Sequence, residues 1–455
     1  MRSIPVVSIL VAGWFGLGAC GGKGAPPPAG PPVGGGDVSG GEPAVNDGLV
    51  APPAGPPVAE ARPQTDTMHG VTVADPYRWL EGDTAEVKAW SDGQDRHARA
   101  ILDALPGLGA IAEEVRAYYA APITRYGGFQ VAGGKVFAWR KQPDKEQREL
   151  VVMTSLDKAA EAKLVLDPAA GGDATRAIDW FVPSPDGRKV AVSISTGGSE
   201  AGSLHVLDLD GKALEPVIAD VQYGTGGGDI AWTPDGRGFY YTRYPRAGEK
   251  PEQERAFWIE VWFHQLGTPE ATDRYELGKD LPQIAQYRLD VDARGRVLAA
   301  VQKGDGGEFQ HYLKDARGWR RLADWDDDIV SVQFGPAGDL WLVSRKGAPR
   351  GKLLRMPTTG KLAAAKLVVA ESADTIVTSF YEDEAAVLTR DRVFLTYQLG
   401  GPNTIRAFTH AGKPAKGPAL PAVSSSFLVD DSRRASAGDT VRLAIPAEEL
   451  HIFPR

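Results

Sequence analysis

The chain has 455 residues, of which 42% are hydrophobic and 24% are charged, and its formal net charge is −8. The 51 basic residues form no basic block, which argues against nucleic acid as a partner. A single cysteine excludes a disulfide framework and any cysteine-based zinc or iron–sulfur site.

The N-terminus has the pattern of an export signal. A short basic start precedes an apolar run from Ile4 to Leu17, which is too short to span a bilayer comfortably and ends in small residues before Cys20. Leu-Gly-Ala-Cys resembles the bacterial lipobox, so residues 1–20 are expected to be a lipoprotein signal peptide with Cys20 as the lipidated residue. Gly21 after the cysteine favours the outer membrane of the cell envelope, with membrane attachment only through the lipid. The alternative is an ordinary signal peptide that happens to hold a cysteine.

Residues 21–61 are dominated by glycine and proline. Gly21 to Glu60 contain 11 Gly and 10 Pro, and the heptapeptide PPAGPPV occurs twice, at Pro27–Val33 and Pro52–Val58. Such low-complexity sequence is partly stiff and partly flexible. We expect a disordered linker that acts as a tether.

Residues 62–122 are expected to be a short helical segment. Asp75 is placed to cap a helix with Pro76 in its first turn, and a second start at Asp83-Thr84 leads into apolar residues at helical spacing up to Leu105. Another short amphipathic helix is expected after Pro106-Gly107.

From residue 123 to residue 455 the pattern changes to short strands with recurring turns. A turn Gly or Asp precedes a strand run every 43 to 59 residues, at Gly134, Gly187, Gly236, Gly295, Gly338, Asp391 and Gly438. Repeats near this length, each with about four short strands, are the signature of a β-propeller. We therefore expect a mainly β protein with a seven-bladed propeller. Only Pro446 to Arg455 follow the strand run of the seventh repeat, so the last blade is expected to be incomplete.

Several motifs together resemble the prolyl oligopeptidase family. They occur in the family's order between about Arg62 and Val423, as DPYRWLE from Asp75, LDP from Leu166, SPDG from Ser184, WTPDGRGFYYTRYP from Trp232, HQLGT from His264 and APRG from Ala348. The resemblance implies a two-part serine peptidase. In that family a propeller restricts entry to short peptides, often cleaved after proline, while an α/β-hydrolase domain carries the Ser–Asp–His triad. This sequence matches the helical segment and the propeller, and the hydrolase part is expected to be absent.

No catalytic residue is assigned. An α/β-hydrolase nucleophile needs Gly-x-Ser-x-Gly, and no serine here has glycine at both positions. The nearest is Ser199, which is expected to lie in a loop between strands. We therefore expect this chain alone to be catalytically inactive.

No metal or cofactor site is predicted either. The histidines form no HxxH or HExxH pair; they are His69, His97, His205, His264, His311, His410 and His451. The acidic run Asp324–Asp328 lacks the pattern of a calcium loop and is expected to be a solvated loop between blades. Gly224–Asp229 leads into a strand and not a helix, so it does not predict a phosphate site.

Two readings of function follow. The first is the substrate-filtering propeller of a prolyl oligopeptidase-type peptidase, with short peptides and a hydrolase domain in trans as partners. The second is a stand-alone lipoprotein propeller that binds a peptide or a protein at the cell envelope.

Overall fold

The computed structural model describes residues 55–119, 123–379, 385–400 and 402–417. These residues divide into two compact units, one up to residue 119 and one from residue 123, and each is described by itself. Cys20, most of the linker and the seventh turn at Gly438 lie outside the described residues.

The first unit begins with a hairpin of β1 (Gln64–Met68) and β2 (Val71–Asp75), followed by the 3-10 turn η1 (Arg78–Glu81) and the helices α1 (Ala85–Leu102) and α2 (Leu108–Tyr119). Helix α1 begins as expected, because the Thr84 hydroxyl accepts a hydrogen bond from the Val87 N–H at 3.2 Å.

The start proposed at Asp75 is wrong in detail. Asp75 ends β2, and its carboxylate accepts from the Tyr77 N–H at 2.9 Å and from Arg78 at 3.0 Å, which produces only the short 3-10 turn. The hairpin is a further difference from the expected helical segment. His69 and Gly70 join its strands, both with positive φ, which is the geometry of a tight two-residue hairpin turn.

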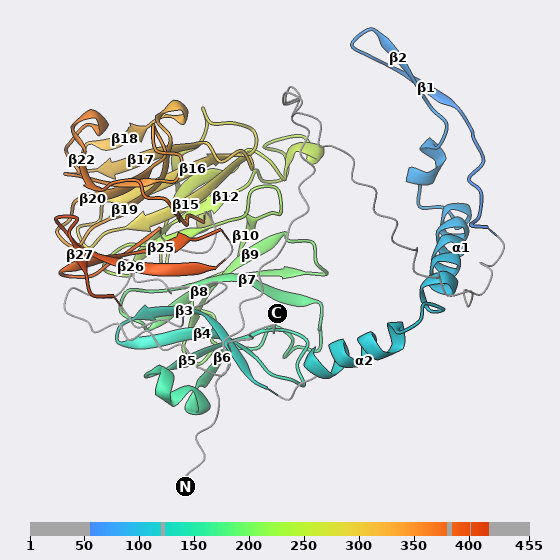
Figure 1. The fold of residues 1–455 in the computed structure, drawn as a ribbon, viewed down its shortest axis with the longest axis horizontal. Coiled ribbons are helices and arrows are strands. Elements are labelled where there is room, and N and C mark those ends of the chain that lie inside the picture. The colour runs from blue at the N-terminus through green and yellow to red at the C-terminus, as the bar shows by residue number, and fades with distance from the viewer. Residues whose placement is uncertain (1–54, 120–122, 380–384, 401, 418–455) are drawn as a thin grey trace, which may run out of the picture. The chain divides into compact units, whose positions relative to one another are not determined.

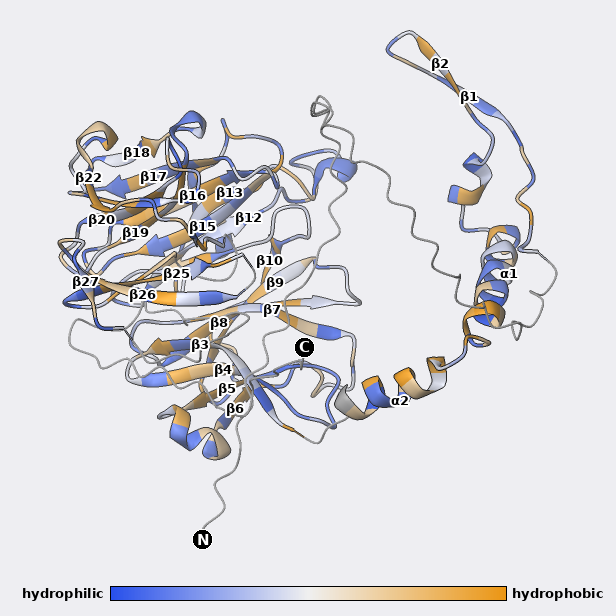
Figure 2. Ribbon diagram, in the orientation of Figure 1, coloured by the Kyte–Doolittle hydropathy of each residue, from blue (hydrophilic) through white to orange (hydrophobic). Residues whose placement is uncertain are grey.

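An extended stretch packs along α1 in this unit. The Gln94 side chain donates to the Pro57 carbonyl at 2.7 Å, and the Trp79 indole donates to the Glu60 carbonyl at 2.9 Å. Gly93 is the buried residue of α1, and a Cβ there would meet the Pro57 ring at 2.6 Å. From the end of α1 through α2, apolar side chains stay exposed: Ile101, Leu105, Ile111 and Val115 are 40% to 61% exposed, and Leu105 lies between the two helices. Figure 2 shows these apolar stretches on α2.

The second unit is a β-propeller, drawn as a ribbon in Figure 1. The described residues contain six propeller sheets, each an antiparallel meander. Blade 1 is β3 (Arg125–Ala132), β4 (Lys135–Lys141), β5 (Glu149–Met153) and β6 (Lys163–Leu166), and blade 2 is β7 (Arg176–Pro183), β8 (Lys189–Thr196), β9 (Gly202–Asp208) and β10 (Ile218–Gln222). Blade 3 is β11 (Ile230–Trp232), β12 (Gly238–Arg243), β13 (Glu260–Gln265) and β14 (Arg274–Leu277).

The remaining blades continue the pattern. Blade 4 is β15 (Ala285–Val291), β16 (Val297–Lys303), β17 (Phe309–Asp315) and β18 (Gly318–Ala323), and blade 5 is β19 (Ile329–Phe334), β20 (Leu340–Ser344), β21 (Lys352–Met356) and β22 (Lys366–Val369). In blade 6, β23 (Thr375–Ile376) and β24 (Ala386–Leu388) both pair with β25 (Arg392–Gln398), which is followed by β26 (Asn403–Thr409) and β27 (Pro414–Ala415). Short 3-10 turns connect some strands: η2 (Leu156–Glu161), η3 (Glu252–Glu254), η4 (Glu270–Thr272), η5 (Trp325–Asp327) and η6 (Leu362–Ala364).

The six turns from Gly134 to Asp391 are confirmed as turns that precede a strand. Each leads into the second strand of its blade, namely β4, β8, β12, β16, β20 and β25. Gly187 shows why the turn residue is glycine: its φ is +60°, and a Cβ would meet a backbone carbonyl oxygen of blade 1 at 2.3 Å.

The hydrophobic core lies between neighbouring blades. One buried cluster joins blades 1 and 2 through Phe137 and Phe181, and another joins blades 2 and 3 through Val206 and Trp232. Hydrogen bonds between innermost strands reinforce this packing. The Gln130 amide donates to the Phe181 carbonyl at 2.8 Å, and the Trp232 indole donates to a blade 2 carbonyl at 3.0 Å. The strand tryptophans Trp139, Trp180, Trp232 and Trp341 pack in or against such buried clusters.

Candidate functional site

One end of the propeller gathers the connections between blades. Because every blade is a meander, the start of its innermost strand, the start of its third strand and the end of its outermost strand lie at the same end. Strand β3 begins at this end, so the chain enters the propeller there.

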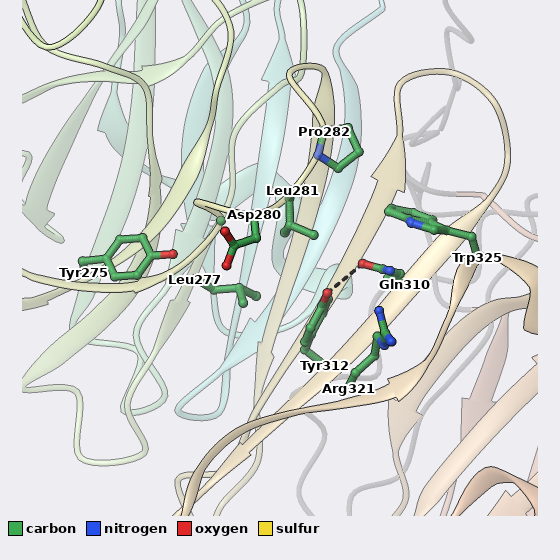
Figure 3. Close-up of a pocket in the computed structure, with 10 residues that line it drawn as sticks. Tyr275, Leu277, Asp280, Leu281, Pro282, Gln310, Tyr312, Arg321 and Trp325 are labelled. Atoms are coloured by element: carbon green, nitrogen blue, oxygen red, sulfur yellow. Dashed lines mark hydrogen bonds between the residues drawn. The ribbon is translucent and has the colours of Figure 1, made fainter.

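A pocket of about 480 Å³ opens at this end between blades 3 and 4 (Figure 3). Its walls come from the end of β14, the connection to β15, the start of β17, the end of β18 and η5. Leu277, Leu281 and Pro282 supply the aliphatic part of the lining, and the rings of Tyr275, Tyr312 and Trp325 supply the aromatic part. This volume and this mixed lining are typical of sites for small ligands.

A hydrogen-bonded network fixes the blade 4 side of the pocket. The Tyr312 hydroxyl donates to the Gln310 side-chain oxygen at 2.7 Å, and the Gln310 amide donates to Asp324 at 2.7 Å. Arg321 also pairs with Asp324, at 2.9 Å. Burial raises the pKa of Tyr312, so its hydroxyl keeps its proton and remains a donor. Asp324 thus orients both Gln310 and Arg321.

The blade 3 side of the pocket carries a carboxylate, Asp280, that has no such partners in the described part of the chain. Asp280 is exposed, and within the described residues it accepts no hydrogen bond and makes no ion pair. Nearby, the Tyr275 hydroxyl oxygen accepts from the Lys279 N–H at 2.9 Å, and the Lys279 ammonium lies 4.1 Å from the centre of the same ring. Burial raises the pKa of Tyr275, so this hydroxyl also stays protonated.

A long loop stands next to this pocket wall. Residues 244–259 join β12 to β13, and the Trp258 N–H donates to the Gln283 carbonyl at 2.9 Å. Trp258 has φ of +63°, a costly conformation for a bulky residue that the surrounding contacts must hold in place. Its indole donates to Glu254 at 2.9 Å, and Lys250 lies 4.6 Å from the centre of its ring. The loop therefore supports the connection that lines the pocket.

Ser199 lies where the sequence placed it, in the turn between β8 and β9. Its hydroxyl accepts from the Ala201 N–H at 3.3 Å, and the next regular element is a strand. The turn therefore leads into a strand, and not into the helix that follows the serine of a nucleophile elbow.

The glycine-rich run Gly224–Asp229, before β11, has a structural role. Asp229, at its end, is 6% exposed, and its two carboxylate oxygens accept the N–H groups of Ile230 at 2.9 Å and Leu289 at 2.8 Å. The second bond joins blade 3 to blade 4. The run is therefore a link between blades 3 and 4.

The acidic run forms η5, with Asp324 as its capping residue and Asp327 completing a capping box. Asp328 follows in the left-handed conformation, with φ of +52°. The run is a connection between blades 4 and 5, as expected, and the place of Trp325 in a pocket was not predicted.

Among the histidines of the described residues, His264 has the most elaborate surroundings. Its Nδ1 lies 2.7 Å from Asp273, which also accepts from the Tyr241 hydroxyl at 2.8 Å, and its Nε2 lies 4.0 Å from Glu215 of blade 2. Both His264 and Asp273 side chains are only 3% exposed. The pair is therefore a buried contact within blade 3, and it is not placed to meet a substrate.

Two further findings concern metal ligands and membrane-spanning helices. Within the stretches that the structure describes, no three His, Cys, Asp or Glu side chains gather closely enough to hold a metal ion. In those same stretches, no helix combines the length and apolar character needed to cross a membrane.

The pocket residues were missed by sequence reasoning. They are spread from Tyr275 to Trp325 with no motif spacing, and Trp325 stood out only as part of the acidic run.

Comparison with known proteins gives a consistent result. Residues 56–437 match the family model of the prolyl oligopeptidase N-terminal β-propeller domain. The prolyl endopeptidase of Elizabethkingia meningoseptica is 28% identical over 332 residues, which cover 69% of this chain and 44% of that protein. Prolyl oligopeptidase A of Galerina marginata is 28% identical over 254 residues, or 50% of this chain and 34% of that protein.

Solved structures agree on the fold. One from a study of two prolyl endopeptidases has a TM-score of 0.66 at 26% identity and covers 81% of this chain and 53% of the other. Prolyl oligopeptidase B of Galerina marginata, bound to a 35-residue hydrolysis and macrocyclization substrate, has a TM-score of 0.65 at 18% identity. The chain thus spans about half of the length of these relatives, or less than half. Because the family model covers most of the chain, the protein belongs to the prolyl oligopeptidase family and contains its N-terminal propeller region.

Proposed function

We propose that this chain is the N-terminal part of a prolyl oligopeptidase-type serine peptidase, whose propeller admits short peptides and keeps folded proteins out. The observation that carries the proposal is the family match over residues 56–437, which spans both units. The structural similarity to a prolyl endopeptidase at 26% identity supports it.

We further propose that the propeller has a seventh blade. The turn at Gly438 repeats the spacing of the six earlier turns, and the strand run Asp439–Ile445 that follows it would contribute to this blade.

The 455 residues themselves are proposed to be catalytically inactive. None of their serines has the glycine neighbours of a nucleophile elbow, and the Ser199 turn leads into a strand. A Ser–Asp–His triad would have to come from residues outside this sequence.

The exposed apolar side chains of α1 and α2 are the proposed contact for such a hydrolase domain, supplied in trans. Ile111 and Val115 are one turn apart on α2, whereas Ile101 lies in the last turn of α1 and Leu105 in the connection that follows it. Full burial of one such side chain contributes about 1.5–3 kcal/mol. Covering four of them would therefore stabilise an association substantially.

The proposed location is the cell envelope, with Cys20 lipidated and residues 21–61 as the tether. The support for this comes from the order of the basic start, apolar run and lipobox-like residues.

The test combines this chain with the C-terminal part of the Elizabethkingia meningoseptica prolyl endopeptidase that lies beyond the matched region. A fluorophosphonate probe should label the added part and leave this chain unlabelled. Hydrogen exchange in α1 and α2 should slow on mixing. Changing Ile111 and Val115 to Ser should abolish the slowing, whereas the control Glu113→Gln should not. Labelling of any serine in this chain at an enzyme-like rate would refute the proposed inactivity.

A further inference from the structure

The pocket between blades 3 and 4 carries polar groups of opposite character at its two ends. Figure 3 shows Asp280 and Tyr275 on one side of Leu281, and Arg321, Gln310 and Trp325 on the other. One end therefore offers a negative charge, and the other offers N–H donors.

The acidic end is ready to receive a cation. Asp280 has no ion-pair partner among the described residues. The Tyr275 hydroxyl oxygen accepts the Lys279 N–H, and its own hydrogen has no acceptor within the described residues. The Lys279 ammonium already lies 4.1 Å from the centre of the Tyr275 ring, so the Asp280 carboxylate is the group at this end that is left for a cation. An ammonium group fits this end.

The other end is ready to receive an anion. Arg321 is held at 2.9 Å by Asp324 through one terminal nitrogen, and its side chain is 50% exposed. A guanidinium has five N–H donors in a planar fork, so several remain for a carboxylate. The Trp325 indole N–H makes no hydrogen bond within the described residues and adds a further donor.

The middle of the pocket is apolar. Leu281 lies between the two ends in Figure 3, and Leu277, Pro282 and the Tyr312 ring line the same pocket. A ligand that fits all three parts has an ammonium at one end, an apolar centre and a carboxylate at the other. Short peptides with free termini have this arrangement.

We propose that this pocket is a binding subsite for a di- or tripeptide with both termini free, with Asp280 binding the ammonium and Arg321 with Trp325 binding the carboxylate. The proposal rests on the proposed function, because it is the filtering of short peptides that brings such molecules to this end of the propeller. The subsite would hold a peptide near the end of the propeller where the chain enters.

The experiment measures binding to the full chain alone by ligand-observed NMR, using the tripeptide Ala-Leu-Ala. N-acetylation and C-amidation of the peptide should each weaken binding about tenfold, since each removes one charge-assisted hydrogen-bonded contact. Asp280→Asn should weaken binding of the free peptide about tenfold and leave the affinity for the N-acetylated peptide unchanged. Arg321→Gln should likewise weaken binding of the free peptide about tenfold and leave the affinity for the C-amidated peptide unchanged.

Controls separate this result from general charge effects and from misfolding. Arg317→Gln removes an exposed charge of the same blade outside the pocket, where Arg317 pairs with Asp315, and should leave binding unchanged. The blocked peptides test the wild-type chain even if a variant does not fold. Equal affinity for free and blocked peptides would overturn the subsite. Because no hydrolase is present, this outcome is distinct from a failure of the complementation test of the proposed function.

Discussion

Replacing Asp229 by alanine should weaken the contact between blades 3 and 4. The carboxylate is buried and accepts two backbone N–H groups, one in its own blade and one at Leu289 across the blade boundary. Each hydrogen bond to a charged group contributes about 1.5–3 kcal/mol, so losing both is expected to cost about 3–6 kcal/mol. That loss is a large share of the 5–15 kcal/mol that typically separates folded from unfolded domains.

The assay is urea unfolding followed by tryptophan fluorescence, together with hydrogen exchange at the Leu289 amide. Asp229→Asn keeps one carbonyl oxygen and should lose about half as much stability as Asp229→Ala. Asp235→Ala is the matched control: this exposed residue accepts only within its own turn, from Thr233 and Arg237. A loss below about 1 kcal/mol for Asp229→Ala, with unchanged exchange at Leu289, would show that the interblade bond is dispensable.

Three further predictions concern location, acid stability and turn geometry. Cys20→Ala should move the protein from the membrane fraction to the soluble fraction, and unchanged partitioning would contradict the lipobox interpretation. Burial lowers the pKa of His311 to about 4, so the folded state keeps it neutral while the unfolded chain binds a proton below about pH 6.5. Stability should therefore be complete above pH 6.5 and fall by about 3 kcal/mol towards pH 4, and His311→Gln should remove this part of the fall in urea titrations at several pH values. Gly187→Ala and Gly197→Ala both place a side chain at positive φ, but only position 187 has a backbone atom within 4 Å of the new Cβ. Thermal unfolding should show a clearly larger loss for Gly187→Ala, and equal losses would argue against the steric reason.

The propeller repeat was predictable because its turns and second strands have strong local signals. Pro-Asp-Gly places glycine at the left-handed position of the turn, where Gly187 and Gly236 indeed have φ near +60°. The strands that follow are buried along most of their length, so they read as nearly continuous apolar runs, as β8 and β20 do. Such local patterns can be recognised in the sequence even when the partner strand is not known.

The hairpin of the first unit was not predicted because it buries almost nothing. Every residue of β1 and β2 is exposed except Asp66 and Asp75, which are half-buried, so neither strand shows the alternation of a half-buried sheet. The turn at His69-Gly70 was the available signal, since glycine tolerates the positive φ observed there.

The pocket could not have been predicted from local patterns. Its residues come from two blades and two connections, so only the packing of blade 3 against blade 4 brings Tyr275 near Tyr312 and Trp325. Neither blade alone forms the site.

Some carboxylates of the propeller already accept hydrogen bonds within the protein, whereas Asp280 accepts none within the described residues. This difference decides which of them can bind a ligand. Glu149 is 2% exposed and accepts from Arg140 and Gln142 at 2.8 Å, while Asp179 accepts from two serine hydroxyls at 2.6 and 2.7 Å. Such groups are satisfied in the free protein, so removing them destabilises the fold whether or not a ligand is present. Asp280 makes no comparable contact within the described residues, and its full hydrogen-bonding capacity is therefore available to a bound cation. A substitution at Asp280 should consequently change binding while leaving the free energy of unfolding within about 0.5 kcal/mol, which makes it the position where recognition can be separated from stability.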